Sequence, residues 1–128
     1  MIIKNFIKAA RLRTLPLSIS GIILGGFLAM SDGLFNGVIF SLALITTIGF
    51  QVISNFANDY GDGVKGTDAI RIGEERMVSS GKISPKQMKK AIMISVILTI
   101  IFALFLIYES FGLSNFGYSV LFFILGIV

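Results

Sequence analysis

The sequence predicts an all-α protein, built as a polytopic transmembrane helical bundle. Apolar residues make up 55% of the 128 residues and charged residues only 14%, whereas a soluble domain carries about 25% charged residues. Four uncharged runs approach or reach the length that crosses a bilayer, which is about 20 helical residues. All Lys and Arg residues fall on one side of these runs.

The composition also excludes whole classes of chemistry. The chain has no Cys and no His, so disulfides, zinc sites and Ser–His or Cys–His nucleophiles are excluded. The net charge of +4 could suggest a nucleic-acid partner. The bases fall into two clusters separated by long apolar runs, and membrane topology explains this pattern better than nucleic-acid binding does. The clusters are Lys4, Lys8, Arg11 and Arg13, then Lys65, Arg71, Arg76, Lys82, Lys86, Lys89 and Lys90.

Residues 1–13 predict an amphipathic helix ahead of the first span. Apolar residues recur there at helical spacing, opposite Lys4, Lys8 and Arg11. Such a helix is suited to lie on an anionic membrane surface. A solvated basic end that only sets topology is the alternative, and the two interpretations are compatible.

Residues 15–30 predict the first membrane helix. The small residues around Met30 loosely resemble a signal-peptide cleavage site. The later spans nevertheless commit the chain to a polytopic fold, so an uncleaved helix is favoured.

Residues 34–57 and 91–108 predict two further spans, and residues 116–128 begin a fourth. The connections at 31–33 and 109–115 contain no base, whereas the N-terminus and the segment 58–90 hold all of them. The positive-inside rule therefore places the N-terminus and the 58–90 loop in the cytoplasm, with the chain in a bacterial inner membrane.

A polar stripe marks the end of the second predicted span. Its members are spaced by three or four residues, which places them on one helix face: Gln51, Asn55, Asn58, Asp59 and Asp62. Amides within a span must face the bundle interior or a water-filled cavity. For Gln51 alone, a helix–helix hydrogen bond is an equally good interpretation.

Glycines at 61, 63 and 66 are expected to end this helix and expose the backbone. Asp68 could then fold back towards Asp59 and Asp62. Three carboxylates at a membrane surface repel one another unless a cation lies between them, and oxygen ligands favour Mg²⁺. Lys65, Arg71, Arg76 and Lys82 follow and could neutralise a diphosphate.

Two rival motifs fail. Residues 61–66 match Gly-x-Gly-x-x-Gly, but a membrane-length run precedes them where a dinucleotide fold needs a strand. A calcium-binding EF-hand starting at Asp59 would have Ile70 at the position of the bidentate Glu.

Residues 55–68 (Asn-Phe-Ala-Asn-Asp-Tyr-Gly-Asp-Gly-Val-Lys-Gly-Thr-Asp) resemble the first aspartate-rich motif of the intramembrane aromatic prenyltransferases, the UbiA superfamily. Together with residues 11–17, 71–73 and 80–85, they are most similar to the menaquinone branch, the 1,4-dihydroxy-2-naphthoate polyprenyltransferases. In much of the superfamily a third carboxylate stands where this chain has Gly66.

The resemblance implies a role for each polar residue. Asn58, Asp59, Asp62 and Asp68 would hold Mg²⁺ against the diphosphate of a polyprenyl donor. Lys65, Arg71 and Arg76 would neutralise that diphosphate, and Gln51 and Asn55 would line the cavity below. Asp59, Asp62 and Arg76 are the expected catalytic residues.

The implied reaction transfers a polyprenyl chain from its diphosphate to 1,4-dihydroxy-2-naphthoate, an aromatic acid, with loss of the ring carboxylate and a proton. The alternatives are another acceptor on the same scaffold, or a non-catalytic membrane fragment whose acidic loop binds cations. The resemblance also implies an N-terminal portion of a larger bundle, without a second aspartate-rich motif. We therefore expect no transferase activity unless the remaining helices are present.

Overall fold

The computed structural model describes residues 2–66 and 75–127, and within these ranges it is helical with no strand. The elements are α1 (Ile2–Ala10), the 3-10 helix η1 (Leu12–Thr14), α2 (Leu15–Ser31), α3 (Gly37–Lys65) and α4 (Pro85–Ile127). Three stretches are long and apolar enough to cross a membrane: Ile2–Ser31, Gly37–Lys65 and Pro85–Gly126. The predicted all-α membrane bundle is confirmed.

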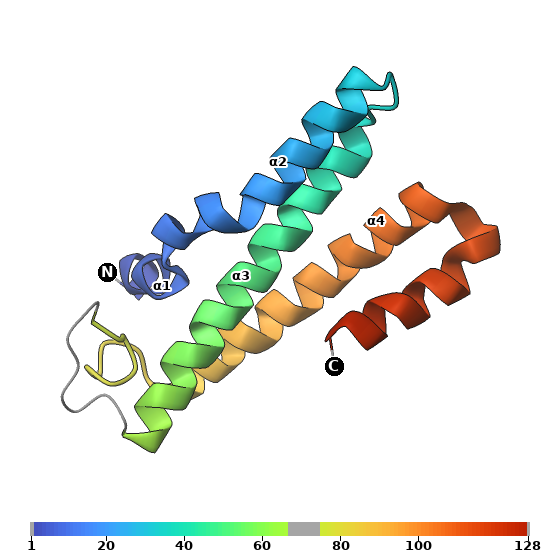
Figure 1. Cartoon of the computed structure of the whole chain (residues 1–128). Helices are drawn as coiled ribbons and strands as arrows, with labels where there is room; N and C mark the ends of the chain where they lie inside the picture. The colour runs from blue at the N-terminus through green and yellow to red at the C-terminus, as the bar shows by residue number, and fades with distance from the viewer. Residues whose placement is uncertain (1, 67–74, 128) are drawn as a thin grey trace.

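Helix α3 is the centre of the arrangement (Figure 1). Helix α2 lies along its N-terminal half, and the first part of α4 runs beside it in the opposite direction. Helix α1 lies against the C-terminal half of α3, where the rings of Phe6 and Phe56 meet edge to face with centroids 6.1 Å apart. Helix α1, the C-terminal end of α3 and the start of α4 therefore lie close together. We call this part the loop end of the bundle.

The N-terminal segment bends where the sequence suggested one amphipathic stretch. Helix α1 ends at Ala10, and Arg11 adopts a left-handed backbone conformation (φ 51°) before η1 begins. Ala9 and Ala10 are buried, whereas Ile3 is 72% exposed. The placement of α1 on a lipid surface stays a prediction.

The turn between α2 and α3 is closed by local hydrogen bonds. The backbone N–H of Leu34 donates to the carbonyl of Ala29 (2.8 Å). The side chain of Asn36 accepts from the N–H groups of Val38 (2.9 Å) and Ile39 (3.1 Å), which is the usual way of satisfying free donors at a helix start. This cap explains why α3 begins at Gly37, three residues after the apolar run starts.

Helix α3 ends later than the sequence suggested. It passes through Gly61 and Gly63 and continues to Lys65, and Gly66 (φ 66°) then ends it in the left-handed conformation. Glycine lowers helix propensity by only about 1 kcal/mol, and tertiary packing can outweigh that. The first eight residues of the expected 58–90 loop are therefore helical.

Helix α4 takes up the other end of that loop and both later predicted spans. Ser84 caps its start: its hydroxyl accepts from the N–H of Gln87 (3.2 Å), whose side chain accepts from the N–H of Ser84 (3.0 Å). The helix breaks at Gly112 (φ 68°, ψ −179°), and the second arm turns back (Figure 1). Phe123 on that arm approaches Phe50 of α3, with ring centroids 5.9 Å apart.

The buried core sits at the loop end. It consists of residues from α1, α3, α4 and the connecting 75–84 segment: Ala9, Ala10, Phe56, Met77, Val78, Ile83 and Met88. Along the rest of the bundle many large apolar side chains are exposed, as Leu17 (84%) and Phe122 (72%) illustrate. Such surfaces suit lipid contact. The polar residues at the loop end, in contrast, lie beside the buried core.

Candidate functional site at the loop end

The polar face of α3 divides into two parts in the structure. Its upper part, Gln51 and Asn55, faces the start of the chain. The amide of Asn55 donates to the carbonyl of Ala10 (2.8 Å) and to the hydroxyl of Thr14 (3.2 Å). The amide of Gln51 donates to Thr14 (3.3 Å), and the Ser18 hydroxyl donates to Gln51 (2.5 Å). In this structure the two amides join α3 to the α1–α2 junction.

The lower part of the face begins with Asp59, which is only 2% exposed. Its two carboxylate oxygens accept hydrogen bonds from consecutive backbone N–H groups, those of Met77 (2.9 Å) and Val78 (2.8 Å). A buried carboxylate needs such donors because burying it unpaired is costly. Asp59 therefore links α3 to the 75–84 segment.

One turn further along α3, Asp62 forms an ion pair with Arg76. The guanidinium Nη2 lies 2.9 Å from a carboxylate oxygen of Asp62. The Arg76 side chain is 8% exposed and that of Asp62 is 33% exposed. An acid and a base that the sequence could only place in one loop are thus in direct contact.

Gly63 permits the close approach of the 75–84 segment. A Cβ atom added there would collide with the side chain of Val78, whereas one added at Gly61 would meet nothing within 4 Å. The segment therefore packs directly on the α3 backbone beside the two carboxylates.

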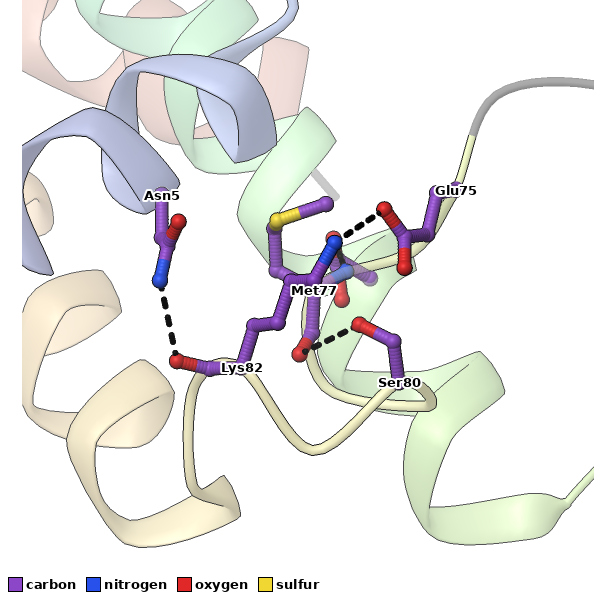
Figure 2. A network of polar contacts seen from close by, with 6 residues as sticks. Asn5, Glu75, Met77, Ser80 and Lys82 are labelled. Carbon is purple, nitrogen blue, oxygen red and sulfur yellow. Dashed lines mark hydrogen bonds and ion pairs between the residues drawn. The ribbon is translucent and has the colours of Figure 1, made fainter. Parts of the chain in front are cut away.

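The outer side of the 75–84 segment is tied by exposed polar contacts (Figure 2). The Lys82 ammonium lies 2.6 Å from the Glu75 carboxylate, and Asn5 of α1 donates to the Lys82 carbonyl (3.2 Å). The hydrogen bond from Lys82 lowers the pKa of the Glu75 carboxyl below its ordinary value of 4.5. Helix α1 thus also helps to hold the segment.

A pocket of about 400 Å³ lies between the start of the chain and the 75–84 segment. Its lining combines bases and apolar side chains with one acid: Ile7, Lys8, Arg11, Leu12, Arg13, Glu75 and Met77. Bases of the first cluster therefore lie at the same end of the bundle as Arg76.

The remaining predicted site residues are Asn58, Lys65, Asp68 and Arg71. Asn58 and Lys65 are exposed at the end of α3. Asp68 and Arg71 lie outside the described residues. Within 2–66 and 75–127, no three His, Cys, Asp or Glu side chains gather closely enough to hold a metal ion by themselves.

Sequence reasoning missed the partners of the polar stripe. Thr14 and Ser18 lie one helical turn apart at the start of α2 and contact Gln51 and Asn55. Their four-residue spacing beside a predicted span was a usable signal, because polar side chains on facing membrane helices tend to pair.

Comparison with known proteins gives consistent matches. A model of the UbiA prenyltransferase family matches residues 19–127. The chain is 43% identical over 109 residues to a 1,4-dihydroxy-2-naphthoate octaprenyltransferase from Haemophilus influenzae, covering 82% of this chain and 35% of that protein. It is 45% identical over 94 residues to the enzyme of the same name from Escherichia coli, covering 73% and 30%.

A more distant relative of the same name, from Mycobacterium tuberculosis, is 35% identical over 96 residues, covering 73% of this chain and 32% of that protein. The chain thus spans about a third of the length of the curated relatives it matches. No solved structure matches it with comparable significance.

Proposed function

The chain belongs to the UbiA prenyltransferase family, and we propose that it carries one half of a site that holds a polyprenyl diphosphate and expels the diphosphate. The contact between Asp62 and Arg76 at the end of a membrane-length helix carries this proposal. It brings together a group that can bind a metal ion and a group that can bind phosphate.

The metal in this proposal is Mg²⁺, and the donor chemistry of the described residues fits it. Asn58 and Asp62 are four residues apart on α3, so their oxygens share a face, and both are reachable from solvent. Mg²⁺ commonly takes one or two protein carboxylates and completes its shell with water and phosphate oxygens. Asp68 would add a ligand from the loop. When bound, the ion would neutralise charge on the departing diphosphate.

The bases would neutralise the charge of the diphosphate. Arg76 is held against Asp62, so its guanidinium is already placed beside the expected metal ligand. Lys65 ends the same helix, and Arg71 would join from the loop. Negative charge develops on the diphosphate as its bond to carbon breaks. Positive groups that are already fixed at this point lower the barrier to cleavage, because they need not reorient during the reaction.

We propose 1,4-dihydroxy-2-naphthoate as the acceptor, because the relatives reported above are named 1,4-dihydroxy-2-naphthoate octaprenyltransferases. Departure of the diphosphate leaves an electron-poor allylic carbon. The electron-rich ring attacks this carbon, and the ring carboxyl group (–COOH) then leaves as CO₂ and a proton, so that the electrons of its bond to the ring restore aromaticity. The product would enter menaquinone synthesis. The loop end would lie on the cytoplasmic side of a bacterial inner membrane, in line with the position of all Lys and Arg residues.

The test is binding of farnesyl diphosphate to the detergent-solubilised protein, with and without Mg²⁺. We expect binding that requires Mg²⁺ and is lost in Asp62→Ala. Asp32→Ala, which removes a carboxylate beyond the far end of α2, is the matched control and should bind normally. Binding that is indifferent to Mg²⁺ or to Asp62 would contradict the proposal.

A further inference from the structure

We propose that Asp59 is a positioning residue: it anchors the 75–84 segment on α3 and so places Arg76 opposite Asp62. This inference rests on the proposed function, because Arg76 is assigned there to the diphosphate. It gives Asp59 a role different from the metal ligand that the motif suggests.

The hydrogen bonds of Asp59 identify the anchor. Each of its two carboxylate oxygens accepts from a different backbone N–H, those of Met77 and Val78. An ionised carboxylate offers only acceptors, so it matches two consecutive donors. An asparagine could accept from one of them but would turn its own N–H donors towards the other.

The anchor acts on Arg76 through the chain itself. Arg76 immediately precedes Met77, so fixing the N–H groups of residues 77 and 78 fixes the backbone from which the Arg76 side chain extends. Asp62 lies three residues after Asp59, on the same side of α3. The segment thus meets the helix at two neighbouring points, one a pair of backbone hydrogen bonds and the other the ion pair.

Burial separates the two aspartates. Asp59 is 2% exposed and lies among Met77 (1%) and Val78 (7%), whereas the Asp62 side chain is 33% exposed. Asp62 can therefore meet a ligand from solution while Asp59 remains covered by the segment. Without Asp59, two backbone donors in this packed region would lose their acceptor, which is a costly loss.

The first experiment measures the position of the segment without any ligand. The chain has no Cys, so spin labels at Ser41→Cys and Ser79→Cys report one distance. Ser41 lies near the start of α3 and Ser79 beside its end, and a rise of about 1.5 Å per helical residue gives an expected distance of about 30 Å. We expect a narrow distance distribution in the parent protein and a broad one in Asp59→Asn. A distribution that stays narrow in Asp59→Asn would overturn the proposal.

A glycine pair provides a variant in which every carboxylate is kept. Gly63→Ala should displace the segment because its new Cβ collides with Val78, and it should broaden the distribution as Asp59→Asn does. Gly61→Ala has open space around its Cβ and is the matched control that should leave the distribution narrow.

The second experiment separates positioning from metal binding. We expect Asp59→Asn and Gly63→Ala each to weaken Mg²⁺-dependent binding of farnesyl diphosphate by about tenfold, because Arg76 is misplaced. The affinity for Mn²⁺ alone, used as the metal probe in place of Mg²⁺, should be unchanged. Adding Arg76→Gln to Asp59→Asn should cause little further loss, because both changes remove the same interaction.

The opposite pattern would reject the anchor. If Asp59→Asn lowers the affinity for Mn²⁺, while Gly63→Ala changes the affinity for neither Mn²⁺ nor farnesyl diphosphate, Asp59 is a metal ligand. If the parent protein binds no farnesyl diphosphate, the proposed function fails, and the spin-label distances still decide whether Asp59 holds the segment.

Discussion

At the scale of single residues, the amides of α3 show how one pattern can serve two purposes. Gln51 and Asn55 were expected to line a cavity, because polar groups in a span must face inward. In the structure they face inward and bind Ala10, Thr14 and Ser18. Helical spacing correctly gave the inward direction, but it carries no information on which segment lies opposite. The cavity-lining role stays a prediction.

We predict that Asn55→Ala lowers the free energy of unfolding by about 1–2 kcal/mol, because the buried carbonyl of Ala10 loses this donor and the part-buried Thr14 hydroxyl loses one of its two. Thermal unfolding in detergent measures this. Asn58→Ala on the exposed side of the same helix should change stability by no more than about 0.5 kcal/mol. Equal effects of the two substitutions would show that the hydrogen bonds of Asn55 contribute nothing specific.

Asp59 and Asp62 were given the same expected roles from the sequence, and in the structure they have different surroundings. Asp59 contacts backbone N–H groups and Asp62 contacts a guanidinium. The difference arises from the position of the 75–84 segment, which is distant in sequence. The metal-binding roles of Asp62 and Asp68 stay predictions, and for Asp59 the anchoring role proposed above takes the place of metal binding.

At the scale of elements, the apolar runs predicted where helices occur but not where they end. Helix α3 continues through two glycines, and Gly63 packs so closely on Val78 that a Cβ atom there would collide with it. Helix propensities do not include such tertiary contacts. The start of α4 had a readable signal in Ser84, Pro85 and Gln87, which form a capping box with Pro at the first helical position.

The break in α4 depends on Gly112. Its backbone (φ 68°, ψ −179°) lies in a region that residues with a Cβ rarely adopt. We predict that Gly112→Ala destabilises the bend by about 1–3 kcal/mol. Spin labels at Ser95→Cys and Ser119→Cys should then show a changed distance between the arms. Gly117→Ala, in a helical region with open space around it, is the control and should keep the distance; a change in both variants would point away from the bend.

At the scale of the whole molecule, the distribution of charge predicts orientation. Every Lys and Arg residue lies at the N-terminus or between α3 and the early part of α4, and the structure brings these regions together at the loop end. We predict that single cysteines at Ser31 and Ser84 lie on opposite sides of the membrane. In intact cells, an impermeant maleimide should label Ser31→Cys but not Ser84→Cys, and labelling of both from outside would refute the orientation.

The sequence by itself determined the fold class, the helical runs and the family resemblance, and it predicts that the basic residues lie on one side of the membrane. The fold class and the helical runs follow from composition and local periodicity, because the bilayer requires long apolar helices and the chain order fixes their alternation. The family resemblance rests on the motif at residues 55–68 and the stretches that accompany it. Only the tertiary structure decided that Asp59 binds backbone, that Asp62 meets Arg76 and that bases of the first cluster line one pocket with Glu75 and Met77. Those contacts join residues separated by 14 to about 65 positions along the chain, and their partners are chosen by packing at the loop end, where burial leaves each polar group few acceptors or donors.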